Sequence, residues 1–168
     1  MKIEYSIFND MLTANILWGK IVWALRDMLD EYGGDNDDIL RLRYYDADHI
    51  EDDDDEDFET ICSCEMSLIR SKNGSEETRL LLVNLMKRKS TGNCSIGIPI
   101  KKHTIVVWFE SNKAMNPITR CYIGLTDEHG EQIDANKCTD KIVNIALSLV
   151  VEICRSFFAS LPKKKKEK

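Results

Sequence analysis

Two closely spaced cysteines are the first residues in this chain that suggest chemistry. Cys62 and Cys64 are separated by a single serine. Structural zinc sites use cysteine pairs at wider spacing together with a second pair of ligands, and the sequence offers no such second pair. Both thiols fall on the apolar side of an alternating segment, where cysteine packs as a small hydrophobe. We therefore predict core packing for this pair, with no metal site and no cofactor.

Two histidines could serve acid–base catalysis, because imidazole titrates near neutral pH. His129 stands between Asp127 and Gly130 in a turn-forming segment, and His103 precedes an apolar run. Neither lies in a nucleophile motif, and the sequence has no glycine-rich phosphate loop and no Gly-x-Ser-x-Gly elbow. We predict no catalytic residue. An enzyme that uses a lone thiol or scattered carboxylates is the third of three hypotheses for the function.

An acidic run is the most unusual feature of the composition. Calcium-binding loops need alternating ligands and a glycine for the turn, and the run has neither. Blocks of like charge stay extended through self-repulsion, so residues 46–57 are predicted to form a solvated loop. The functional alternative is an electrostatic arm for a basic partner. Its candidate partner-binding residues are Asp52, Asp53, Asp54, Asp55, Glu56 and Asp57.

Length and composition predict one globular domain. The chain has 168 residues, of which 43% are hydrophobic and 31% charged, which suffices for a core without metals or disulfides. We place the domain at residues 1–162 and a disordered basic tail at 163–168. The formal charge of -6 disfavours binding to nucleic-acid phosphates.

No export signal or membrane span is recognisable in the sequence. No export signal is visible at the start of the sequence, so the six cysteines are predicted to be reduced thiols of a cytoplasmic protein. The lysines at 163–166 keep nuclear import open as an alternative. No apolar run is long enough to predict a membrane span.

Apolar periodicity predicts a helix at each end of the chain. In residues 6–32 the apolar stripe has helical spacing, and Gly33-Gly34 ends it. This stripe predicts packing on a sheet, with a homodimer seam as the alternative. Residues 139–161 form the second helix, with Thr139 as its N-cap. The stripe of the first helix consists of Ile7, Met11, Ala14, Trp18, Ile21, Leu25, Met28 and Tyr32.

The middle of the chain alternates with period two, as half-buried strands do. Because the segments are joined by short turns, such as the one at Asn73-Gly74, we predict an antiparallel meander. Residues 95–100 are predicted to be an edge strand at best, because Pro99 cannot donate to a ladder. The other strands are predicted at 39–45, 58–70, 78–86, 104–109 and 119–126. The expected fold is α+β, an antiparallel sheet of about five or six strands with both helices packed on it.

The function that this sequence favours is a non-enzymatic protein-binding module, such as an adaptor, chaperone or immunity-like protein. Its partner is another protein, with a basic one as an option, and Trp18 and Trp23 join the acidic run as candidate contact residues. The alternative is a small-molecule carrier with a pocket between the C-terminal helix and the sheet. The candidate pocket residues are Met66, Trp108, Phe157 and Phe158.

Overall fold

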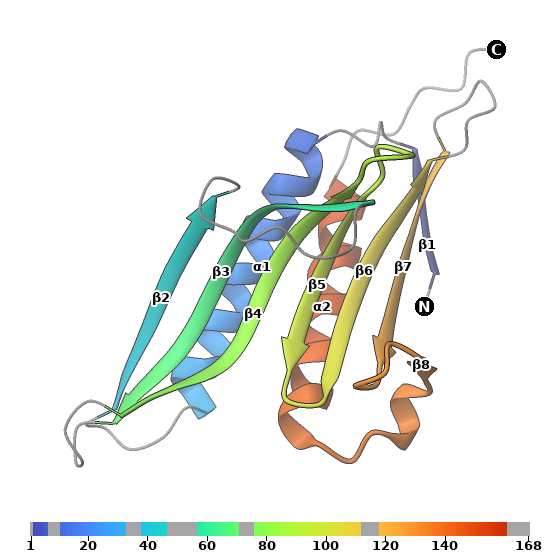
Figure 1. Cartoon of the computed structure of the whole chain (residues 1–168). Coiled ribbons are helices and arrows are strands. Elements are labelled where there is room, and N and C mark those ends of the chain that lie inside the picture. Colours follow the sequence, from blue (N-terminus) through green and yellow to red (C-terminus); the bar gives the residue numbers. More distant parts are fainter. Residues whose placement is uncertain are drawn as a thin grey trace, which may run out of the picture.

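The computed structural model describes residues 2–6, 11–32, 38–46, 57–70, 76–111 and 118–160. Eight strands and two long helices make up the fold (Figure 1). Their bounds are β1 Lys2–Ser6, α1 Met11–Tyr32, β2 Ile39–Asp46, β3 Phe58–Arg70, β4 Glu76–Arg88, β5 Cys94–Ile100, β6 His103–Ser111, β7 Ile118–Thr126, β8 Gln132–Ile133 and α2 Lys141–Ser160, with a short 3-10 helix at Ala135–Lys137.

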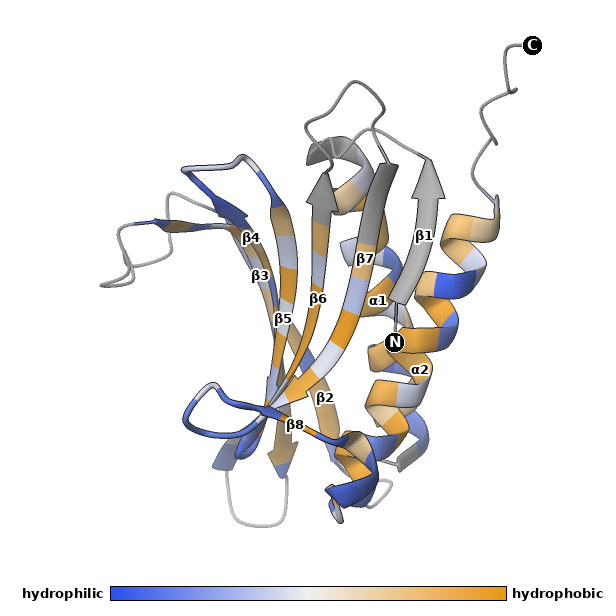
Figure 2. Ribbon diagram, turned by 90° about the vertical axis from the view of Figure 1, so that its right-hand side faces the viewer, coloured by the Kyte–Doolittle hydropathy of each residue, from blue (hydrophilic) through white to orange (hydrophobic). Residues whose placement is uncertain are grey.

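All strand pairs are antiparallel and form one sheet in the order β1-β7-β6-β5-β4-β3-β2. The short strand β8 pairs with the end of β7 that β1 does not reach. Both helices lie on the same side of this sheet (Figure 2). The predicted α+β fold is therefore confirmed, although the sheet has more strands than expected.

The additional strand at the N-terminus corrects one prediction. The first helix was predicted from residue 6, but Ser6 is the last residue of the strand β1, and α1 begins at Met11. β1 forms because β7 offers it a partner, with Ile3 opposite Cys121. A pairing over such a distance in sequence leaves no local signal in five residues.

The position of β5 corrects a second prediction. The strand lies inside the sheet, between β4 and β6, and not at its edge. Its pairing with β4 stops at Gly97, so Pro99 has a strand partner only on the β6 side, where it is opposite Thr104. A proline is tolerated there because β4 requires no N–H group from it.

The core lies between the helices and one face of the sheet. On α1, Ala14, Ile21, Leu25 and Met28 of the expected stripe are buried, so this part of the stripe packs within the chain. Ile7 lies outside the described residues, and a homodimer stays a prediction. On α2, Val143, Ala146, Val150, Cys154, Phe157 and Phe158 are buried. Phe158 contacts Phe109 of β6 edge-to-face, with 6.3 Å between ring centroids. The expectation that the C-terminal helix covers the sheet is confirmed.

The N-terminus of α2 is capped one residue later than expected. The carboxylate of Asp140, not Thr139, accepts hydrogen bonds from the backbone N–H groups of Ile142 at 3.0 Å and Val143 at 3.2 Å. The ammonium of Lys101 lies 3.1 Å from the same side chain. The two hydrogen bonds satisfy N–H groups in the first turn of the helix, and the ion pair with Lys101 holds the capping carboxylate.

By length and composition alone, α2 is long and apolar enough to cross a membrane, although the sequence predicted no membrane span. A core helix of a globular domain has the same composition. In this fold α2 buries six of its side chains against its neighbours.

Candidate functional site

A groove runs between α1 and α2 on the outer surface of the helix layer. The two helices are antiparallel (Figure 1), so the C-terminal half of α1 lies beside the N-terminal half of α2. The groove has a volume of about 820 Å³. Its lining consists of Ala24, Asp27, Met28, Glu31, Thr139, Lys141, Asn144, Ile145, Ser148, Leu149 and Glu152.

The floor of the groove is apolar. Ala24 and Met28 are one helical turn apart on α1, and Ile145 and Leu149 have the same spacing on α2. Residues at this spacing share one side of a helix, so each pair faces the other helix. Met28 is buried, whereas the other three keep part of their surface exposed. The floor therefore offers apolar surface to a bound segment.

The rim of the groove is predominantly acidic. Asp27 and Glu31 on α1 and Glu152 on α2 bring three carboxylates, against the single ammonium of Lys141. All four side chains are exposed, so they can meet a partner without a large desolvation cost. Asn144 also lines the groove and donates from Nδ2 to the carbonyl of Cys138 at 2.8 Å.

Trp23 projects from α1 next to this groove. Its side chain is 58% exposed, and the guanidinium of Arg26 lies 4.9 Å from the ring centroid. Trp23 and Asp27 are one turn apart, so the indole and the acidic rim share the outer side of the helix. Ile16, two turns before Trp23, is 47% exposed. Trp23 is therefore accessible to a partner, which a predicted contact residue must be.

Trp18, the other residue of α1 that was predicted to contact a partner, is instead bonded within the fold. Trp18 donates from Nε1 to the backbone carbonyl of Val83 at 2.9 Å. Its ring meets Tyr44 edge-to-face at 6.4 Å. The Nε1 atom of Trp18 is therefore hydrogen-bonded within the fold. The ring of Trp18 packs against Tyr44 on the neighbouring surface.

The predicted acidic loop 46–57 is described only at its two ends, and its first residue, Asp46, belongs to β2 and not to the loop. Asp52, Asp53, Asp54, Asp55 and Glu56 lie outside the described residues. The carboxylate of Asp57 accepts from the backbone N–H of Ser90 at 3.0 Å and from its hydroxyl at 3.1 Å. The side chain of Arg88 lies 3.4 Å away. Asp57 therefore has a local role in the turn after β4.

The four candidate pocket residues are not brought together. Met66, Phe157 and Phe158 are buried in the core on the helix side of the sheet. Trp108 pairs with Tyr122 and stacks on its ring at 6.2 Å. Its neighbours Val107 and Phe109 belong to the buried core, so alternation places Trp108 on the opposite face of the sheet. None of the four lines the groove.

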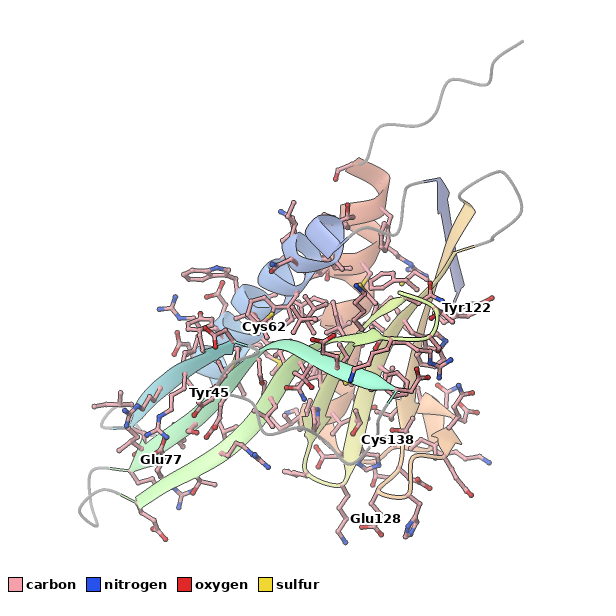
Figure 3. All side chains as sticks on the ribbon, turned by 45° about the horizontal axis from the view of Figure 1, so that its top comes forward. Tyr45, Cys62, Glu77, Tyr122, Glu128 and Cys138 are labelled. Carbon is pink, nitrogen blue, oxygen red and sulfur yellow. The ribbon has the colours of Figure 1, made fainter. Side chains whose placement is uncertain are left out.

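The thiols and histidines are spread over the fold. None of the six cysteines forms a disulfide, and Cys62 and Cys138 are well separated (Figure 3). Burial raises the pKa of the Cys62 thiol to about 11. The Sγ atom of Cys138 lies 3.9 Å from Nε2 of His103. His129 is exposed beside Glu128. In the described ranges, no group of three or more of these side chains and carboxylates could hold a metal ion.

Sequence reasoning missed the groove because its two walls are far apart in the chain. The spacing of Asp27 and Glu31 on one side of a predicted helix was visible. Nothing in the sequence placed Glu152 beside them. Only the antiparallel contact of α1 with α2 brings the three carboxylates to one surface.

No family model, curated protein or solved structure matches this chain.

Proposed function

We propose that this chain is a non-enzymatic protein-binding module whose groove between α1 and α2 takes a basic, amphipathic helical segment of a partner protein. The observation that carries the proposal is the combination of an apolar floor with three rim carboxylates against one ammonium. An amphipathic helix that lies in an apolar groove is a common mode of peptide recognition.

The shape of the groove favours a helix as the bound segment. Two adjacent antiparallel helices leave a furrow into which the side chains of a third helix can insert. Apolar side chains of the partner at helical spacing would contact Ala24, Ile145 and Leu149. These three residues supply the apolar part of the interface.

Charge favours a basic segment. Lysine or arginine on the flanks of the bound helix would meet Asp27, Glu31 and Glu152. The formal charge of -6 over the whole chain also attracts a basic partner at long range and raises its association rate.

Trp23 supplies an anchor beside the groove. Tryptophan and arginine are enriched among the residues that dominate binding energy, and here Arg26 stacks on the exposed ring. We expect the partner helix to cover this indole while its charged flank meets Asp27.

The test is a charge reversal on the rim with a matched control. The probe is a designed helical peptide with leucines on one side and lysines on the other, and its affinity is measured by fluorescence anisotropy. The double change Asp27→Lys and Glu31→Lys should weaken binding about tenfold. Asp30→Lys changes an exposed carboxylate of the same helix that does not line the groove, and it should change the affinity by less than about twofold.

Two results would count against this proposal. One is equal affinity for the lysine peptide and for a version with glutamate in place of lysine. The other is a loss caused by Asp30→Lys that equals the loss caused by the double change. Circular dichroism of each variant checks that the helices are retained.

The volume of the groove supports a small-molecule carrier as the second candidate. Ligand pockets have volumes of about 300–1,000 Å³, and the groove falls in that range. Native mass spectrometry of the purified protein separates the candidates. A carrier should show an adduct that is lost on unfolding, whereas the peptide-binding module should show only the mass of the polypeptide.

A further inference from the structure

A second surface lies on the edge strand β2. In the part of the chain that the structure describes, β3 is the only strand that pairs with β2. The edge of a sheet presents backbone N–H and C=O groups that can pair with an additional strand. β2 is eight residues long, contains no proline, and carries Ile39 and Tyr44 at 62% and 59% exposure.

Exposed apolar side chains occur on this strand and on α1. The large hydrophobic residues that are exposed among the described residues are Ile16, Trp23, Ile39 and Tyr44. Ile39 and Tyr44 belong to β2 itself, so an added strand would find apolar side chains on this edge.

Tyr44 connects the edge strand to α1. Its ring meets Trp18 edge-to-face at 6.4 Å. On the same helix, the guanidinium of Arg26 lies 4.9 Å from the ring centroid of Trp23. Tryptophan, tyrosine and arginine are the side chains that most often dominate binding energy in interfaces.

The two sides of β2 differ in character. Leu42 and Tyr44 pair with Met66 and Cys64, so they lie on the helix side of the sheet. Ile39, Arg41, Arg43 and Tyr45 lie on the opposite side. A strand added to this edge would therefore meet apolar side chains on one side and two arginines on the other.

A second copy of this chain is a poor occupant of the edge. A twofold dimer would pair β2 with itself in antiparallel register. The two longest such registers are centred on Leu42 and on Arg43, and they place Arg41 opposite Arg43 or Arg43 opposite itself. Like charges directly opposite each other destabilise a strand pair.

The same arginines suit a segment that carries carboxylates. Nη2 of Arg43 already lies 3.2 Å from Oε2 of Glu77, which belongs to β4. The side chain of Arg41 is exposed. Carboxylates at alternate positions of an added strand would lie on the side of these two arginines and would satisfy their charge.

We propose that β2 accepts an extended segment of another protein in which acidic and apolar residues alternate. The segment continues the sheet through backbone hydrogen bonds, places its acidic side chains beside Arg41 and Arg43, and places its apolar side chains beside Leu42 and Tyr44. This mode of recognition adds a strand to an exposed sheet edge. It uses the edge of the sheet and not the groove between the helices.

A synthetic peptide tests this inference on the full chain. The probe is a labelled peptide of about eight residues in which glutamate and valine alternate, matched in length to β2, and its affinity is measured by fluorescence anisotropy. Arg41→Glu should weaken binding about fivefold and should strengthen binding of the corresponding lysine–valine peptide. Lys137→Glu, which changes an exposed cation in the 3-10 helix that follows β8, should change either affinity by less than about twofold.

Backbone pairing has its own control. A peptide methylated on alternate backbone nitrogens keeps its charge but loses its donors, and it should no longer bind. Hydrogen exchange should show slower exchange in residues 39–46 when the unmodified peptide is bound.

Three outcomes would overturn the inference. They are unchanged binding of the methylated peptide, equal effects of Arg41→Glu and Lys137→Glu, and a dimer that the peptide dissociates. The last would show that a second copy occupies β2.

Discussion

The indole Nε1 of Trp18 donates a hydrogen bond to the backbone carbonyl of Val83 at a distance of 2.9 Å, across 65 positions of sequence. Val83 directly precedes Asn84, the first residue of β4 that pairs with β5. The preceding part of β4 pairs only with β3. The hydrogen-bonded pairing of β4 with β5 therefore ends beside Val83. The indole of Trp18, from α1, lies at the point where this pairing ends. This contact ties the first helix to the middle of the sheet.

Removal of this donor should destabilise the fold. Val83 is fully buried, so Trp18→Phe leaves its carbonyl without the indole donor and should lower the free energy of unfolding by about 1–3 kcal/mol. Trp23→Phe, at a 58% exposed position, should cost less than about 0.5 kcal/mol. Urea denaturation followed by circular dichroism measures both. Equal losses would mean that the hydrogen bond contributes nothing specific.

Asp140 should stabilise α2 in a pH-dependent manner. Burial opposes its ionisation, but the N–H of Val143 and the ammonium of Lys101 outweigh burial and lower the pKa of Asp140. A lowered pKa in the folded state means that the contribution is present above the pKa of the unfolded chain, near 3.9, and is lost as the pH falls through the folded value.

Two substitutions separate the cap from the charge. Asp140→Ala should cost about 1 kcal/mol at pH 7. Asp140→Asn keeps a capping oxygen and should cost less, but it should remove this residue's contribution to the decline in stability below about pH 4. The measurement is the midpoint of urea denaturation between pH 3 and 7. Identical pH profiles for wild type and Asp140→Asn would contradict the assignment.

The thiol of Cys62 should react slowly near neutral pH. Burial raises its pKa to about 11, and the thiolate is the reactive form. Its alkylation by iodoacetamide should therefore rise about tenfold per pH unit between pH 7 and 10. Mass spectrometry of the digested protein gives the rate at this residue. In urea the alkylation rate should stop rising once the pH exceeds the ordinary thiol pKa of about 8.5. If the rate for the folded protein also stopped rising at that pH, burial would not have raised the pKa of Cys62.

Phe158 should be a major contributor to the packing of α2. Its ring meets Phe109 at 6.3 Å and Phe157 at 5.2 Å, and only 7% of its surface is exposed. Phe158→Ala should lower the free energy of unfolding by about 3–5 kcal/mol. Ser156→Ala, an exposed position on the same helix, serves as the control and should change it by less than about 0.5 kcal/mol. A small loss at Phe158 would mean that the end of α2 is not anchored on β6.

The sequence alone determined most elements, because each one carries its burial pattern locally. In β3, Cys64, Met66 and Leu68 alternate with polar residues, and alternation with period two predicts a strand wherever its partner lies. The stripe of α2 has helical period, and it packs as expected. Such patterns say which side of an element is buried, and they predicted the α+β fold on that basis.

Only the tertiary structure decided which elements became neighbours. β1 depends on the pairing of Ile3 with Cys121, and the interior position of β5 depends on where its ladder with β4 stops. The groove exists because Asp27 and Glu152 come from helices at opposite ends of the chain. The physical reason is the same in each case. Periodicity records that a side chain leaves water, whereas the partner that covers it is chosen by packing among segments distant in sequence.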